Sequence, residues 1–411
     1  MHFPISPRVV LIKTLSFFFA AALLFFFSVF SAAETVSDPM RDPSTRYGYE
    51  NGLLVQTAAL PEREGTALLM FTGDIMCLTG QQRSARTGNG FDLSSGFRFV
   101  RGLFSLSDLT VGNLETVISA SSPLTMDRRS GTDGRPYCNA PEALADALRY
   151  AGYDALVTAN NHCCDAGESG IRETISALDE RSLYHTGTFS EKAAPRALLF
   201  DVNGIRIGMI ATTNSVNGHE RSISAENRGW MLNLYDEERI RQDIELLREA
   251  GAEYIVAWMH SGKENSSFVT RIQRSHAAFL ADAGADLIIG AHPHVLQKAE
   301  YIETADGRRV LCAYSLGNFL SSMSKVTGNR DTAILCITLK RSEAGVELSD
   351  AGYIGARVLN TSASGPFTVV PVVSALNSGF SDKSLLSAQK RIRKALGKEL
   401  REITETDSLF P

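Results

Sequence analysis

Side chains that can bind a metal ion stand where six apolar runs of the sequence end. Each run leads into a short polar stretch that contains carboxylates, carboxamides or imidazoles. Oxygen and nitrogen ligands of these kinds suit divalent Mn, Fe, Zn or Mg rather than a soft metal held by thiolates. The residues are Asp74 in GDIM, Asn113 and Glu115 in GNLE, Asn161, His162 and Asp165 in ANNHCCDAG, His260 and Glu264 in HSGKE, His292 and His294 in AHPH, and Asn318 in YSLGNF.

Four of the eight histidines belong to this set. A single histidine at a strand end is more often structural than a ligand, so the prediction of one shared metal or polar catalytic site depends on the motifs occurring together. His292 and His294 flank a proline, which favours an extended backbone for His292. Two histidines in H-x-H share one face only when the backbone is extended.

Alternating strand-like and helix-like segments must position these polar stretches. Apolar, strand-like runs lie at 68–76, 103–116, 153–162, 253–260, 286–294, 309–320 and 332–340, and helices are predicted over 141–152, 169–183, 237–252, 268–285 and 383–403. The turn signals Asn203-Gly204 and Asp306-Gly307 predict two hairpins, which would make part of the sheet antiparallel. This alternation favours a layered α/β fold, in which ligand sites form where strands end.

The motifs GDIM, GNLET, ANNHCCDAG, HSGKE, GADLIIGAHPHVLQ and YSLGNF stand in an order that resembles the CapA/PgsA family. These are the poly-γ-glutamate capsule biosynthesis proteins, and the resemblance extends over about residues 67–322. It implies a calcineurin-like metallophosphoesterase fold, a four-layer αββα sandwich with mixed sheets. The chain is expected to consist of a signal or anchor at 1–33, a linker at 34–66, this domain at 67–322, and C-terminal strands and a helix at 323–411 that complete or extend it.

The resemblance also implies two groups of metal ligands that share one carboxylate. The first group would be Asp74 and His294, the second Asn161, His260 and His292, with Glu115 bridging the two.

The remaining residues of the set would act around those ligands. His162 would stabilise or protonate the reacting group, and Asp165 would orient the loop that carries it. Glu264 would be a base near the ligands, and Asn113 and Asn318 further polar residues of the site.

Three positions depart from the pattern of related proteins. Typical metallophosphoesterases have Asp-x-His in the first motif, whereas Met76 replaces that histidine here, as is usual in CapA-like proteins. This replacement weakens the first metal site. The family usually has Trp and Tyr where this chain has Ser261 and Asn265. An aromatic wall of the pocket is therefore either missing or supplied by Trp258.

The N-terminal segment has the pattern of an export signal. No charged residue occurs between Lys13 and Glu34, Arg8 precedes the apolar core, and the tripeptide SAA ends it at Ala33. This pattern predicts a secretory signal peptide that is cut after Ala33. Residues 14–33 are also about long enough to span a bilayer, so an uncleaved membrane anchor is the alternative. Either interpretation places the rest of the chain outside the cytoplasm, in the periplasm or at the cell surface, free or anchored facing outward.

Export would permit disulfides among the six cysteines. None of them forms C-x-x-C, which excludes a zinc ribbon. Cys163 or Cys164 could reach Cys138, and Cys312 could pair with Cys336 across a sheet. The alternative is that all are buried free thiols.

Composition and motifs together leave three functions open. The formal net charge of −5 predicts no nucleic-acid partner. The first function is an exported CapA-like protein in the synthesis, transfer or trimming of poly-γ-glutamate or a related surface polymer, beside a membrane synthase complex. The second is a periplasmic metallophosphoesterase on a phosphoester, and the third a non-catalytic scaffold of the synthase complex. An active site of this kind would perform metal-assisted hydrolysis or transfer, on an anionic polymer or a phosphoester.

Overall fold

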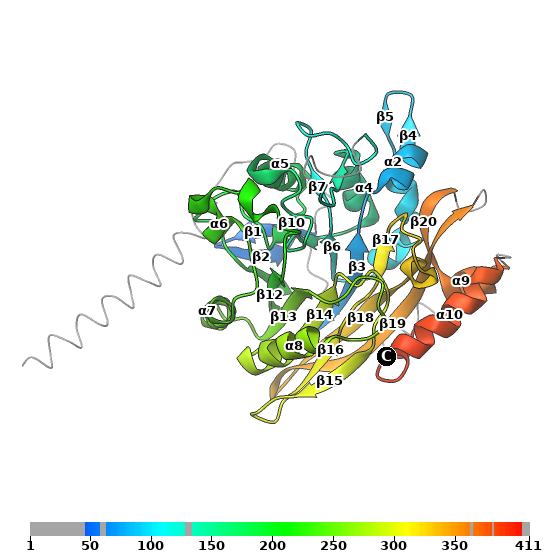
Figure 1. Ribbon diagram of the computed structural model, residues 1–411. Helices are drawn as coiled ribbons and strands as arrows, with labels where there is room; N and C mark the ends of the chain where they lie inside the picture. The colour runs from blue at the N-terminus through cyan, green and yellow to red at the C-terminus, as the bar shows by residue number, and fades with distance from the viewer. Residues whose placement is uncertain (1–45, 58–62, 128–133, 362–364, 380–381, 405–411) are drawn as a thin grey trace, which may run out of the picture.

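The computed structural model describes residues 46–57, 63–127, 134–361, 365–379 and 382–404 (Figure 1). The predicted signal peptide or anchor at 1–33 lies outside these residues. Within the described ranges, no helix has both the length and the apolar character needed to cross a membrane. Export and anchoring therefore stay predictions.

Two mixed β-sheets form the middle of the molecule (Figure 1). The first, called sheet A, contains these described strands in spatial order: β1 (Tyr47–Glu50), β2 (Leu53–Gln56), β11 (Leu198–Val202), β12 (Ile205–Thr213), β13 (Tyr254–His260), β14 (Leu287–Ala291), β16 (Arg309–Ala313) and β15 (Ala299–Glu303). Strands β12, β13, β14 and β16 are parallel neighbours. The two predicted hairpins are confirmed, since β11 pairs with β12 and β15 with β16 in antiparallel fashion.

The second sheet, called sheet B, combines parallel strands with a long antiparallel hairpin. Its described strands are, in order, β10 (Tyr184–Thr186), β9 (Ala155–Val157), β6 (Leu109–Leu114), β3 (Thr66–Ile75), β18 (Asp331–Ser342), β19 (Gly345–Thr361) and β20 (Gly365–Pro371), with β17 (Asn318–Leu320) beside β3 and β21 (Arg401–Glu402) beside β19. Because β18 pairs with β3 in the centre of the sheet, residues after 322 complete this sheet.

Apolar side chains from the facing surfaces of the two sheets form one core. Phe71 and Val111 of sheet B and Ile207 and Trp258 of sheet A belong to it, and all are buried. The rings of Phe71 and Trp258 meet edge to face with centroids 6.2 Å apart. Burial of each such side chain contributes about 1.5–3 kcal/mol, so this contact fixes the sheets relative to each other.

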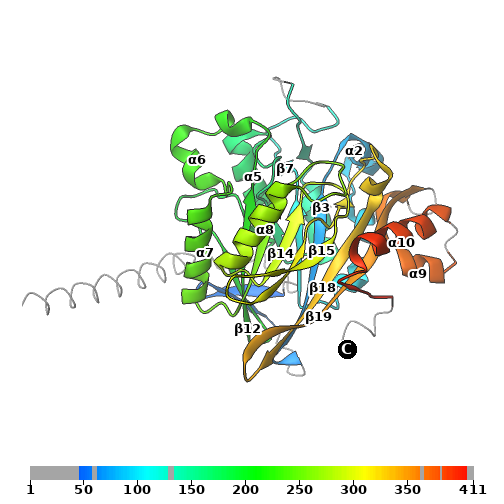
Figure 2. The ribbon, with the colours of Figure 1, turned by 60° about the horizontal axis from the view of Figure 1, so that its bottom comes forward.

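Helices cover the two outer surfaces. Apolar residues of α7 (Glu237–Glu249) and α8 (Arg271–Ala283) pack with those of sheet A, and Figure 2 shows the two helices next to each other. Residues of α2 (Thr79–Ala85), α3 (Arg101–Phe104) and α4 (Ala143–Ala151) pack with the other face of sheet B. The predicted four-layer αββα architecture is therefore confirmed. Around it lie α5 (Gly167–Asp179), α6 (Ala225–Met231), α9 (Val372–Asn377), α10 (Lys383–Leu396), and the short strands β4 (Arg86–Thr87), β5 (Gly90–Phe91), β7 (Val117–Ile118) and β8 (Asn139–Ala140).

Local sequence signals explain where the helices begin and end. Thr270 caps α8 by accepting a hydrogen bond from the backbone of Gln273, in a reciprocal capping box. Gly152 ends α4 at φ 100°, a left-handed conformation that suits glycine. The C-terminal helix, predicted to reach residue 403, ends at Leu396 instead, since Gly397 follows and residues 401–402 join sheet B as a strand.

The predicted linker at 34–66 is wrong for residues 47–56. These residues form β1 and β2, which extend sheet A, and the side chains of Tyr47 and Leu54 are buried in the core between the sheets. Arg46 also binds Asp154 of sheet B through two hydrogen bonds of 2.9 and 2.7 Å. Because the segment is short and polar overall, its sequence did not indicate that Tyr47 and Leu54 are buried.

The six cysteines all lie within the described residues and are buried free thiols. The predicted Cys312–Cys336 pairing is wrong, because Cys312 lies in β16 of sheet A and Cys336 in β18 of sheet B, in separate apolar clusters. Cys163 and Cys164 lie with their sulfur atoms 3.7 Å apart, and the Cys138 sulfur lies 4.0 Å from Nε2 of His162.

Candidate metal centre

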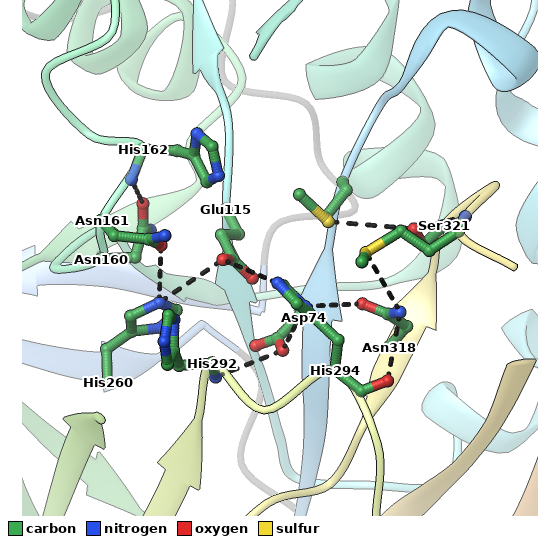
Figure 3. A network of polar contacts seen from close by, with 12 residues as sticks. Asp74, Glu115, Asn160, Asn161, His162, His260, His292, His294, Asn318 and Ser321 are labelled. Carbon is green, nitrogen blue, oxygen red and sulfur yellow. Dashed lines mark hydrogen bonds and ion pairs between the residues drawn. The ribbon is translucent and has the colours of Figure 1, made fainter. Parts of the chain in front are cut away.

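The carboxyl ends of five parallel strands bring the predicted ligands together. Strands β3, β6 and β9 of sheet B and strands β13 and β14 of sheet A end at the same edge of the sandwich, and their side chains point toward one another in Figure 3. Asp74 lies beside Asn113 and Asn318 in register. Asn318 begins β17 rather than ending a strand, which corrects the prediction. Gly73 is required here, since a Cβ atom would lie 1.9 Å from the carbonyl oxygen of Gly317.

The first ligand group consists of Asp74, Glu115 and His294, whose candidate ligand atoms lie within 4.8 Å of one another. Nδ1 of His294 is 3.2 Å from Asp74 Oδ2, and its Nε2 is 3.6 Å from Glu115 Oε1. All three side chains are buried. Two carboxylates and one imidazole thus face the same small volume.

The second ligand group consists of Glu115, His260 and His292, again within 4.8 Å. Nε2 of His260 lies 3.4 Å from Glu115 Oε1 and 2.8 Å from Asn161 Oδ1. The rings of His260 and His292 have centroids 4.9 Å apart. The two groups share Glu115, which is the arrangement that the resemblance implies, while metal binding itself stays a prediction.

Glu115 shows that these residues fit divalent cations. Both of its carboxylate oxygens are buried and have no hydrogen-bond partner among the described residues. Burial raises the pKa of this carboxyl group to about 8. A buried carboxylate without a hydrogen bond is costly, and bound cations would satisfy both oxygens. The donor atoms are carboxylate, carboxamide and imidazole, which suit Mn, Fe, Zn or Mg.

The two groups differ in their electrostatics. Burial lowers the pKa of His260 to about 3 and that of His292 to about 4. Burial acts in the same direction on His294, but the carboxylates of Glu115 and Asp74 outweigh it and raise the pKa to about 9. Burial would raise the pKa of Asp74, yet His294 and other donors lower it overall.

The H-x-H segment is bent, so the predicted extended backbone is wrong. His292 has φ 98° and His294 φ 57°, both in the left-handed region. The bend sends the two imidazoles to different ligand groups. The carbonyl oxygen of His294 accepts hydrogen bonds from Asn318 Nδ2 at 3.3 Å and from Asn329 Nδ2 at 3.0 Å. Asn329 also donates to Asn265 Oδ1 at 2.9 Å.

Asparagines at the strand ends of sheet B form hydrogen bonds with other residues of the site. Asn113 Nδ2 donates to Asp74 Oδ1 at 2.8 Å. Asn160 donates to the carbonyl oxygen of Leu114 at 2.7 Å and accepts from the backbone N–H of His162 at 3.1 Å. Sequence reasoning missed Asn160 and Asn329. The ANNH doublet is a signal that could have found Asn160, whereas Asn329 follows the last motif and stands in no pattern.

His162 and Asp165 form a buried pair beside the ligands. Nδ1 of His162 is 2.7 Å from Asp165 Oδ2, so Asp165 contacts the imidazole itself. Burial would lower the pKa of His162, but Cys138 and Asp165 outweigh it and raise the pKa well above the ordinary value. In Figure 3, His162 lies on the Glu115 side of the cluster.

Glu264, Trp258 and Met76 lie in different surroundings from the buried ligand candidates. Glu264 is exposed on the loop after β13 and makes no hydrogen bond within the described part of the chain, although its charge helps to raise the pKa of His294. Trp258 is buried between the sheets against Phe71, so it is not an aromatic wall of the pocket. Met76 is buried, and its sulfur accepts from the hydroxyl of Ser321 at 3.8 Å.

Known proteins are similar in sequence to the part of the chain that carries these residues. A family model described as "Bacterial capsule synthesis protein PGA_cap" matches residues 68–323. The chain is 30% identical to the PGA biosynthesis protein CapA of Bacillus subtilis (strain 168), over 67% of this chain and 68% of that protein. It is 27% identical to the capsule biosynthesis protein CapA of Bacillus anthracis, over 68% of this chain and 65% of that protein, just under two thirds of its length.

Among solved structures, the calcineurin-like phosphoesterase YfkN of Bacillus subtilis aligns with a TM-score of 0.45 and 15% identity, over 79% of this chain and 99% of that one. Both values are low, so the assignment rests on the family model and the two relatives. The chain belongs to the bacterial capsule synthesis protein family PGA_cap.

Proposed function

We propose that this chain acts outside the cytoplasm in the synthesis, transfer or trimming of poly-γ-glutamate or a related surface polymer, through a centre of two divalent metal ions. The observation that carries the proposal is Glu115, a buried carboxylate without a hydrogen-bond partner among the described residues, between Asp74 and His294 on one side and His260 and His292 on the other. The names of the two relatives support the polymer class. The apolar N-terminal segment supports export.

The residues of the chain divide the work of such a reaction. Divalent cations, if held there, would supply Lewis-acid activation of the reacting group and of a water near neutral pH. The five carboxylate and imidazole ligands, with Asn161, would hold those cations. Asp165 holds His162 through Nδ1, so Nε2 is the ring nitrogen that would donate a proton to a leaving group.

A periplasmic metallophosphoesterase is the second candidate. It is favoured by the shared carboxylate, because two cations on either side of one ligand suit in-line displacement at phosphorus. The same geometry also serves a carbonyl substrate. A scaffold of a membrane synthase complex, the third interpretation, would need none of these groups.

Elemental analysis of protein purified without chelator tests the centre. We expect about two divalent ions per chain, one for each ligand group. Absence of bound metal, together with no shift in melting temperature on adding Mn²⁺, would overturn the proposal.

The substrate class is tested by incubating Mn-loaded protein with poly-γ-glutamate and with a panel of phosphodiesters. We expect the polymer to be cleaved or transferred, and activity on phosphodiesters alone would favour the second candidate. His162→Ala should abolish turnover. The matched control is His185→Ala, which removes a histidine that also pairs with an aspartate, Asp179, but stands outside the ligand groups.

A further inference from the structure

Beside the candidate metal ligands, a thiol, an imidazole and a carboxylate lie in a row, each in contact with the next. The sulfur of Cys138 lies 4.0 Å from His162 Nε2, and His162 Nδ1 lies 2.7 Å from Asp165 Oδ2. All three residues are buried. One ring nitrogen therefore faces the carboxylate and the other faces the thiol. This is the order of a nucleophile, its base and the group that orients the base, and thiol contacts of this kind are often longer before substrate binds.

The backbone holds Cys138 in that position. The N–H of Cys138 donates to Asp165 Oδ2 at 2.6 Å, so the same carboxylate fixes the thiol-bearing residue and the imidazole. The carbonyl oxygen of Cys138 accepts from the N–H of Val117 at 3.2 Å, at the start of the β7–β8 ribbon. Val117 follows Glu115 by two residues, so the thiol is tied to the strand end that carries the shared metal ligand.

The second oxygen of Asp165 is also buried. Oδ1 has no hydrogen-bond partner among the described residues and lies 3.8 Å from Nε2 of His219. His219 Nε2 in turn lies 3.2 Å from the carbonyl oxygen of Pro136, two residues before Cys138. A second histidine therefore encloses the carboxylate, which keeps Asp165 beside His162.

The neighbouring cysteines do not share this environment. The sulfur atoms of Cys163 and Cys164 face each other at 3.7 Å. Both residues belong to an apolar cluster with Ile171, Val216 and others. Cys138 alone among the described cysteines has its sulfur within 4.0 Å of an imidazole nitrogen.

We propose that Cys138 is a nucleophile for acyl transfer, with His162 as its base and Asp165 as the residue that positions the imidazole. The substrate class is an amide or ester of a carboxylic acid, and a γ-glutamyl amide is the member that fits the proposed polymer. The choice of that member rests on the proposed function, whereas the chemistry of the thiol rests on the contacts above.

Each step of the reaction balances. The proton of the Cys138 thiol passes to His162 Nε2, which leaves a thiolate beside an imidazolium, and the thiolate sulfur then bonds to the carbonyl carbon. The carbon–nitrogen or carbon–oxygen bond then breaks, the leaving amine or alcohol takes the proton from Nε2, and the acyl group stays on the sulfur as a thioester. Water or a second amine attacks that thioester, Nε2 accepts its proton and returns it to the sulfur, and a free acid or a new amide leaves.

Mass spectrometry of the full chain tests the thioester. The protein is incubated with p-nitrophenyl acetate or with γ-glutamyl-p-nitroanilide, quenched in acid, weighed intact and mapped by peptides. We expect an acyl adduct on Cys138, no adduct in Cys138→Ala, and acylation at least about 100-fold slower in His162→Gln. Cys163→Ala is the matched control, a cysteine next to His162 in the sequence, and should acylate like the unchanged protein.

Two results would overturn the inference: no adduct with either probe, or an adduct whose rate His162→Gln leaves unchanged. The metal content of Cys138→Ser separates this failure from failure of the proposed function. If Cys138→Ser retains the bound metal of the unchanged protein while no adduct forms, the metal centre stands and the nucleophile does not. Loss of metal in Cys138→Ser, which keeps the size of the side chain, would make Cys138 a structural residue and also overturn the inference.

Discussion

The two candidate ligand groups share Glu115 but differ in the protonation of their imidazoles. In the first group, the neighbouring carboxylates raise the pKa of His294 to about 9, so this imidazole carries a proton at neutral pH. In the second group, burial lowers the pKa values of His260 and His292 to about 3 and 4, so both rings are neutral. The imidazole of the first group is thus protonated, whereas the two imidazoles of the second group are neutral.

The cause of this difference is composition. The first group contains two carboxylates and one imidazole, and the second contains one carboxylate, two imidazoles and the carboxamide of Asn161. Since a ligand must lose its proton to bind metal, the second group is the better prepared of the two. The comparison therefore predicts different metal affinities and different pH dependences for the two positions.

Glu115→Gln should have the largest effect, because it removes the one carboxylate that belongs to both groups. We expect both metal ions to be lost, with affinity reduced well beyond the 10–100-fold typical of residues behind the ligands. Elemental analysis after dialysis measures the loss. Glu264→Gln is the matched control, an exposed glutamate on a nearby loop, and should keep its metal. Retention of both ions by Glu115→Gln would show that Glu115 is not shared.

Substitutions on either side of Glu115 should each remove one ion. Asp74→Asn takes a ligand from the first group only, and His292→Ala takes one from the second group only. We expect metal content to fall from about two ions to about one in either variant, and to near zero when the two are combined. Elemental analysis of the three proteins checks this. A single substitution that empties the whole centre would mean that the groups do not bind independently.

Much of this architecture could be predicted from the sequence, for identifiable reasons. The strand ends at Asp74, Glu115 and His260 follow apolar runs that are typical of buried strands, and parallel strand ends meet at one edge. Hairpins at Asn203-Gly204 and Asp306-Gly307 follow from residues that accept positive φ. These signals depend only on neighbouring residues, and the strands and hairpins of the structure agree with them.

Other features depend on contacts between distant segments. The bend at His292 and His294 opposes the local effect of the proline between them and is held by Asn318 and Asn329. Trp258 stands two residues before His260 in β13, on the same face of the strand, yet it lies in the core between the sheets because it packs against Phe71 of the other sheet. Tertiary packing decides both, so no local pattern in the sequence reveals them.

The pH dependence of metal binding should differ between the groups. The raised pKa values of about 8 for Glu115 and about 9 for His294 mean that this interacting pair releases protons between about pH 8 and 9. First-group affinity should rise by about tenfold per pH unit for each displaced proton, up to about pH 9. Second-group affinity should stop rising near pH 8, since only Glu115 releases a proton there. Chelator competition from pH 6 to 10, with Asp74→Asn and His292→Ala isolating the groups, measures both curves; coincident curves would contradict the comparison.

Asn329→Ala should have the smallest effect and should act on the first group alone. Asn329 donates to the carbonyl oxygen of His294 and to Asn265 Oδ1, so it ties the bent ligand loop to the loop after β13. Its loss removes one of the two donors that hold His294 in its left-handed conformation, while Asn318 still donates at 3.3 Å. We therefore expect about a tenfold loss of first-group metal affinity, at the low end of the range for residues behind the ligands.

The measurement for Asn329→Ala is the same chelator competition, made in the His292→Ala background to isolate the first group and in the Asp74→Asn background to isolate the second. Asn227→Ala is the matched control. The side-chain amide of Asn227 also donates a hydrogen bond, to Glu168, but it stands away from the ligands. Second-group affinity should stay unchanged, because the side-chain amide of Asn329 donates to His294 and Asn265 and not to His260, His292 or Asn161. An equal loss of metal affinity in the two groups would show that Asn329 supports the fold of the whole strand-end edge. The difference in metal affinity between the groups would then depend on their charges alone.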